Sequence, residues 1–122
     1  MDTATAVSSL AALAQPHRLA VFRRLVELGP EGALAGDLAA HLAIPANTLS
    51  FHLKSLQQAG LIAPEPRGRY IRYRADFEAM RGLVGFLTDN CCGGDASLCA
   101  PADGPARAAD CCSIPTPDGT TP

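Results

Sequence analysis

The sequence predicts a small, mainly α-helical domain with one β-hairpin, followed by a C-terminal segment of different composition. Apolar residues recur at helical spacing in several stretches before residue 60, and an alternating pattern replaces that spacing directly after Gly60. From residue 91 onward Pro, Gly and Cys become frequent and large apolar residues rare. A chain of 122 residues holds one small hydrophobic core. We therefore expect one folded domain over residues 1–90 and a flexible tail over residues 91–122.

Two helices are predicted before residue 31. Residues 5–14 place Val7 and Leu10 on one helical face, and Pro16 suits the first turn of a second helix. This second helix is expected to end at residues 29–30, a Gly-Pro pair. Four of its apolar residues are expected to be buried: Leu19, Phe22, Leu25 and Val26.

A helix-turn-helix is predicted over the next thirty residues. Three leucines are in phase over residues 34–42, residues 43–46 interrupt the pattern, and three more leucines repeat at helical spacing over residues 47–60. The remaining surface of the last helix is polar, carries a cation and suits insertion beside phosphates and base edges. Its predicted DNA contacts are Asn47, Thr48, Ser50, Phe51, His52 and Lys54, with a structural role within the helix as the alternative for His52.

A β-hairpin is predicted over residues 61–75, where Pro and Gly residues at 64–69 indicate the turn. Residues 64–74 hold four arginines against Glu65, although residues 1–90 as a whole carry nine Lys or Arg against eight Asp or Glu. Such a hairpin alone is as consistent with a solvated turn, but directly after a helix-turn-helix it is interpreted as a wing that contacts phosphates or the minor groove. The predicted wing contacts are Arg67, Arg69, Tyr70 and Arg72.

Three motifs, in this order, resemble the ArsR/SmtB family of winged-helix repressors. LAQPHRLAVFRRL at residues 13–25 is similar to the family's second helix, NTLSFHLKSLQQAGLI at 47–62 to its recognition helix, and RGRYIRY at 67–73 to its wing. The resemblance covers residues 5 to about 90. It implies a mainly α winged helix-turn-helix with about five helices and a two-stranded wing, acting as a transcriptional repressor.

The resemblance also implies a homodimer built from the first and last helices, which would bind a palindromic operator. Apolar residues over 76–90 are in phase, and Gly82 and Gly85, each costing about 1 kcal/mol relative to Ala inside a helix, would let two helices approach closely. The alternative is a weak helix packed on its own domain. The predicted interface residues are Leu10, Phe77, Met80, Val84 and Leu87.

The sensor sites of many ArsR/SmtB members are missing from the matching positions. Residues 32–42 lack the Cys-x-Cys pair of many arsenic-responsive members, and residues 76–90 lack the His that zinc-responsive members use. All the cysteines instead follow residue 90, where clustered thiols in a reducing compartment favour metal binding or redox chemistry over structural disulfides. They are Cys91, Cys92, Cys99, Cys111 and Cys112.

Three of these thiols suit a trivalent metalloid. Arsenite and antimonite take three thiolates in a pyramid, whereas Zn²⁺ prefers four ligands in a tetrahedron. Cys91, Cys92 and Cys99 supply three, and the glycines at 93–94 would free the backbone between them. We therefore predict an arsenite site, with antimonite or methylarsenite as further ligands and with Cys111 and Cys112 left open as additional ligands.

Other functions of the cysteines stay open. Cys91, Cys92, Cys111 and Cys112 could form a structural zinc site, the same repressor could sense cadmium, lead or mercury, and thiol oxidation is a further rival. A thiol-dependent arsenic-handling enzyme is not expected, because Arg107 lies two residues too far from Cys99 for a Cys-x5-Arg oxyanion loop. The N-terminal residues lack the pattern of a signal peptide or membrane span, so we expect a soluble, cytoplasmic protein.

Overall fold

The computed structural model describes residues 1–90 and Gly93. A first compact unit comprises Met1–Met80, and a second begins at Arg81. Apart from Gly93, the predicted tail over residues 91–122, with all its cysteines, lies outside the described residues. No helix in the part of the chain that is described is long and apolar enough to cross a membrane.

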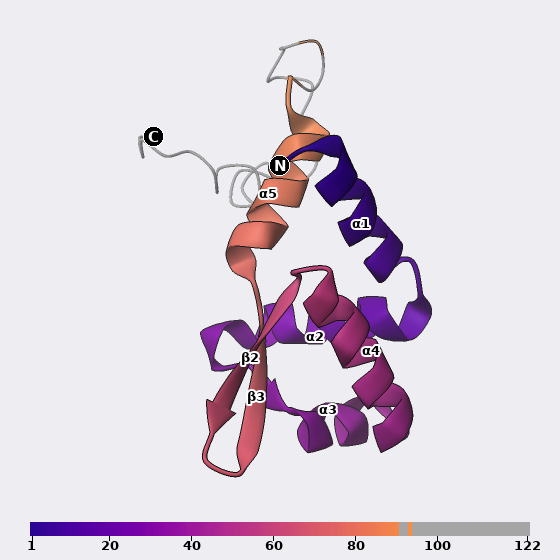
Figure 1. Cartoon of the computed structure of the whole chain (residues 1–122), viewed down its shortest axis with the longest axis vertical. Coiled ribbons are helices and arrows are strands. Elements are labelled where there is room, and N and C mark those ends of the chain that lie inside the picture. Colours follow the sequence, from indigo (N-terminus) through magenta and orange to yellow (C-terminus); the bar gives the residue numbers. More distant parts are fainter. Residues whose placement is uncertain (91–92, 94–122) are drawn as a thin grey trace, which may run out of the picture. The chain divides into compact units, whose positions relative to one another are not determined.

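The described residues form five α-helices and a three-stranded antiparallel sheet, which confirms the predicted fold class (Figure 1). In chain order the elements are α1 (Thr3–Leu13), α2 (Pro16–Leu28), the 3-10 turn η1 (Gly29–Glu31), β1 (Ala33–Leu34), α3 (Ala35–Leu42), α4 (Ala46–Gln58), β2 (Ile62–Arg67), β3 (Tyr70–Ala75) and α5 (Phe77–Thr88).

Local capping sets the starts of the first two helices. The Asp2 carboxylate accepts a hydrogen bond of 2.8 Å from the Thr5 amide at the start of α1. The Gln15 side chain does the same for the Arg18 amide at 2.9 Å, and Pro16 takes the first position of α2 as predicted. Gly29 ends α2 with a φ of +74°, a conformation that favours glycine.

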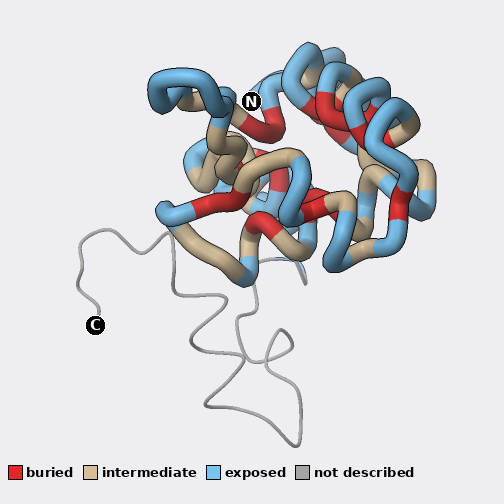
Figure 2. The backbone as a smooth tube through the Cα atoms, turned by 90° about the horizontal axis from the view of Figure 1, so that it is seen from below, coloured by how far each residue is buried: buried red, intermediate tan, exposed pale blue. Residues whose placement is uncertain are grey.

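The core of the first unit lies where α2, α3 and α4 meet the base of the hairpin. Figure 2 colours the buried residues red along the backbone. The largest fully buried side chains include Val21, Leu25, Leu38, Leu49, Leu56 and Leu61. Each buried leucine or valine contributes about 1.5–3 kcal/mol relative to an exposed one.

One predicted core residue is wrong. Leu19 was expected to be buried in α2, yet its side chain is 44% exposed, and Val21 is fully buried in its place. The buried stripe of α2 is centred on Val21, Phe22 and Leu25, and at 100° per residue Leu19 falls outside that stripe. Val26 lies at the margin of the same stripe and is half-buried.

Small residues form the buried face of α1. Ala6, Ser9 and Ala12 are buried, whereas Val7 and Leu10 are exposed by 58% and 42%. The buried face of α1 is therefore made of small side chains, and its larger apolar side chains remain in contact with solvent.

The sheet contains one strand more than the predicted wing. β3 lies between β1 and β2, with Ala33 opposite Tyr73 and Arg67 opposite Tyr70. The predicted turn at 64–69 is too long, because Pro64 and Pro66 belong to β2 and only Gly68 and Arg69 connect the strands. β2 is an edge strand, where proline is tolerated because one side of the backbone has no pairing partner.

Candidate nucleic-acid interface

A three-residue turn joins α3 to α4. Ala43 adopts a left-handed conformation with a φ of +55°, and the Ile44 amide donates to the Ala39 carbonyl at 3.0 Å, which closes the end of α3. Pro45 precedes the first residue of α4. Ile44 is buried together with leucines of both helices, so the turn is fixed by packing as well as by hydrogen bonds.

The outer face of α4, defined here as its exposed residues, is polar apart from Ala46 and one aromatic ring. The buried stripe of the helix consists of Leu49, His52, Leu53 and Leu56. The exposed residues recur at the same helical spacing on the other side and include no acid. They are Ala46, Asn47, Ser50, Phe51, Lys54, Gln57 and Gln58.

Most of the predicted contacts in this helix lie on the outer face. Asn47, Ser50, Phe51 and Lys54 are exposed and Thr48 is half-exposed. Gln57 and Gln58 share the face but were not among the predicted contacts. Their spacing of three and four residues from Lys54 is the sequence signal that could have identified them.

His52 differs from the prediction that placed it beside DNA. It lies three residues after Leu49 and four before Leu56, on the buried stripe, and only 7% of it is exposed. Its ring packs against that of His17 at the start of α2, with the ring centroids 5.5 Å apart and the planes at 70°.

The environment of His52 disfavours its charged form. Its Nδ1 atom is buried and has no hydrogen-bond partner among the described residues. Burial, followed by the charges of Arg18 and His17, holds the pKa of His52 below its ordinary value of 6.5. The imidazole therefore connects α4 to α2 in its neutral form.

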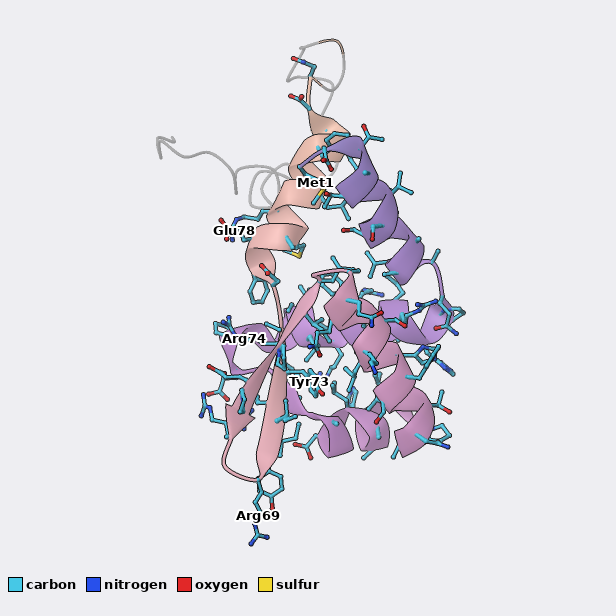
Figure 3. The ribbon with its side chains drawn as sticks, in the orientation of Figure 1. Met1, Arg69, Tyr73, Arg74 and Glu78 are labelled. Atoms are coloured by element: carbon cyan, nitrogen blue, oxygen red, sulfur yellow. The ribbon has the colours of Figure 1, made fainter. Side chains whose placement is uncertain are left out.

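Exposed cations concentrate at the tip of the hairpin. Gly68 has a φ of +62°, which a tight two-residue connection requires at its first position, and Arg69 follows it. Figure 3 shows the Arg69 side chain extending away from the tip. Arg67 and Tyr70 are exposed beside it, with Arg67 held by Glu65 at 3.3 Å.

The side chain of Arg72 is held by a hydrogen bond to the main chain of a neighbouring element. Its Nη1 atom donates to the Glu31 carbonyl at 3.0 Å, which joins β3 to η1. The side chain is half-buried, and together with Arg67, Pro30 and Glu31 it lines a shallow, open depression. Of the predicted wing contacts, Arg67, Arg69 and Tyr70 are thus more exposed than Arg72.

The predicted dimer residues fall into two groups. Leu10 in the first unit and Val84 and Leu87 in the second are exposed, by 42%, 49% and 58% respectively. Phe77 and Met80 are half-buried and pack against the core of the first unit. Among residues 1–90 and Gly93, no cluster of three or more His, Cys, Asp or Glu could hold a metal ion.

Comparisons with known proteins agree with this architecture. A family model described as a helix-turn-helix domain matches residues 13–65. Among solved structures, an ArsR-like transcriptional regulator from Rhodococcus sp. RHA1 is 32% identical, with a TM-score of 0.63 over 78% of this chain and 87% of that one. HlyU from Vibrio cholerae N16961 is 27% identical, with a TM-score of 0.57 over 71% of this chain and 97% of that one.

A third solved structure, a possible transcriptional regulator for arsenical resistance, is 34% identical with a TM-score of 0.53. It aligns over 66% of this chain and 80% of its own. No curated protein sequence matches the chain significantly. The helix-turn-helix, the arginine-bearing wing and the identity over most of both aligned chains lead to one conclusion: the chain belongs to the ArsR/SmtB family of winged-helix, DNA-binding transcriptional regulators.

Proposed function

We propose that the protein is a homodimeric repressor that binds a palindromic operator and is released when trivalent arsenic binds its cysteines. The observation that carries the DNA-binding part is the outer face of α4. It presents polar side chains and a lysine, includes no acid, and belongs to the same unit as the wing arginines. Such a surface suits a polyanion whose base edges offer hydrogen-bond donors and acceptors.

Exposed apolar side chains support the homodimer. Val7 and Leu10 on α1 are exposed, and so, within the second unit, are Val84, Phe86 and Leu87 on α5. Large apolar side chains grouped on a helix surface are typical of an interface. A twofold dimer would present two copies of α4 to successive major grooves, about 34 Å apart.

The cysteine chemistry supports arsenite as the inducer. All five thiols of the chain follow α5 in sequence, and Cys91 comes three residues after the last residue of that helix. Three thiols and one As(OH)₃ give one As(SR)₃ and three water molecules, with no change of oxidation state at arsenic. The proposed ligands are Cys91, Cys92 and Cys99. The similarity to a possible transcriptional regulator for arsenical resistance supports arsenic as the inducer, and the choice of these three ligands rests on the cysteine chemistry alone.

Release requires that arsenite bind the DNA-free state more tightly than the DNA-bound state, since only a difference in affinity shifts the equilibrium. A coupling free energy of about 1–3 kcal/mol would weaken operator binding roughly 5- to 150-fold. Because Cys91 follows α5 so closely in sequence, a ligand there is placed to bias a dimer built with that helix.

The test is a titration of the DNA complex. Duplexes enriched from a random pool by the full-length protein are labelled, and their binding is followed by fluorescence anisotropy with arsenite, antimonite, zinc, cadmium or peroxide. We expect specific binding that arsenite and antimonite reverse at concentrations close to that of the protein. Reversal by zinc or cadmium alone, or by stoichiometric peroxide, would replace arsenic sensing by divalent-metal or redox sensing. Turnover of arsenate with a thiol donor would place the protein among enzymes.

A further inference from the structure

Phe51 is an unusual residue on the outer face of α4. It is 66% exposed, the largest exposed fraction among the large apolar residues of the described chain. The neighbouring exposed residues on this face are polar or charged, including Asn47 one turn before it and Lys54 one turn after it. Leaving an aromatic ring in water is unfavourable, so a partner that covers the ring would gain from its burial.

The ring of Phe51 also contacts the ring of the residue that follows it in the chain. It contacts the ring of His52 edge to face, with the centroids 5.7 Å apart and the planes at 64°. His52 in turn packs against His17 on α2. A side chain supported in this way loses less conformational freedom on binding than one that is free to move.

The surroundings of Phe51 define the partner. Lys54 beside it and the exposed Arg67 and Arg69 on the wing favour a polyanion. On the major-groove edges of the four bases, the apolar group is the C5-methyl of thymine. A phenyl ring presented by a recognition helix therefore matches a thymine methyl.

The amide side chains on the outer face of α4 are also suited to a base pair that contains thymine. Asn47, Gln57 and Gln58 are exposed there, and amide side chains pair with the N6 and N7 positions of adenine. Fewer residues prefer the other base pair, since Lys54 is the one side chain of the outer face suited to guanine and the helix contains no arginine and no acid to accept from cytosine. The chemistry of the face thus favours A·T pairs.

We propose that Phe51 reads the C5-methyl group of a thymine in the major groove of each half-site and thereby sets part of the sequence preference. This inference rests on the proposed DNA-binding function. It adds the base, the atom and the side chain that recognise each other.

The experiment replaces thymine by uracil, which lacks only the methyl group. Duplexes enriched from a random pool by the full-length protein are resynthesised with each thymine, or each symmetry-related pair, changed in turn, and affinities are measured at fixed salt. For the unaltered protein we expect one position per half-site at which uracil weakens binding roughly fourfold, the equivalent of one methyl group removed from water.

Variants assign the effect to the side chain. Phe51→Ala should bind thymine and uracil duplexes equally at that position, whereas Lys54→Ala should weaken both duplexes by the same factor and keep the preference. Because Phe51 is exposed, its replacement should preserve the fold, which circular dichroism checks.

The proposal is overturned if the enriched half-sites lack thymine, if uracil is tolerated at every position, or if Phe51→Ala keeps the discrimination. Failure to enrich any sequence would instead overturn the proposed function itself.

Discussion

His52 joins two helices of the domain, since it lies on the buried stripe of α4 and its ring packs against that of His17 on α2. Its polar character and its place in the recognition helix suggested a DNA contact, but the helical phase places it among Leu49, Leu53 and Leu56. Sequence periodicity could have shown this, because residue 52 is in phase with the leucines. The contact with His17 could not have been predicted, since it depends on how α2 and α4 cross.

The depressed pKa of His52 makes stability depend on pH. The unfolded chain binds a proton near pH 6.5, whereas the folded chain resists protonation because burial, Arg18 and His17 disfavour the charge. Stability from this group is therefore fully present above pH 6.5 and is lost as pH falls through the lower folded pKa. We expect the free energy of unfolding, measured with urea at fixed protein concentration, to decrease from pH 7 to pH 5.

Two substitutions test the origin of that decrease. His52→Leu removes the titrating group and should flatten the pH dependence, while Gln57→Leu, at an exposed residue of the same helix, should leave it unchanged. An equally steep loss of stability in His52→Leu would show that other groups cause it.

β1 shows the limit of pattern reading for short elements. Its two residues are too few to display alternation, so the stretch before α3 was read as the beginning of a helix. Pairing with β3 instead places Gly32 against the backbone of Tyr73. The longer helices and the hairpin could be predicted because each repeats its pattern over several residues.

Gly32, which directly precedes β1, should be difficult to replace. Its φ is +64°, and a Cβ there would collide with the Tyr73 carbonyl, so Gly32→Ala should destabilise the fold by about 2 kcal/mol or more. Gly36 in α3 has open space around it, and Gly36→Ala should stabilise by about 0.5–1 kcal/mol. Urea unfolding compares the two, and equal stabilities would contradict the β1–β3 pairing.

The wing should contribute affinity without sequence preference. Arg69→Ala should weaken binding to enriched and unrelated duplexes by the same factor and lower the salt slope by about one unit, the loss of one phosphate contact. Glu65→Gln removes the acid beside Arg67 and should act in the opposite direction. A change in sequence preference with either variant, in a salt-dependent binding assay, would assign the hairpin to base recognition.

Some features of the whole molecule could be predicted from the sequence, and others could not. The polar outer face of α4 followed from helical spacing, and the exposed Arg67 and Arg69 from the position of the turn. The sequence could not show which of the predicted interface residues are buried and which are exposed. The pattern of α5 is equally apolar at Met80, which packs on the core, and at Leu87, which is exposed.

The dimer should depend on the exposed part of α5. Leu87→Lys places a charge on a proposed apolar interface and should raise the dimer dissociation constant about tenfold or more, with a parallel loss of operator affinity. Leu19→Lys on α2 alters a similarly exposed leucine outside the proposed interface and should leave the dimer intact. Analytical ultracentrifugation decides, and an unchanged dimer in Leu87→Lys would contradict the interface.

We propose that arsenite releases the protein from DNA by binding three thiols. Arsenite titration of variants that lack one cysteine each tests this most directly. Cys91→Ser, Cys92→Ser and Cys99→Ser should each bind the enriched duplex as tightly as the unaltered protein, while the arsenite concentration needed for half release rises about tenfold or more, since each removes one of three ligand bonds. Cys111→Ser should release at nearly the original concentration. Normal release from all three of the first variants, or its loss only with Cys111→Ser and Cys112→Ser, would contradict the account.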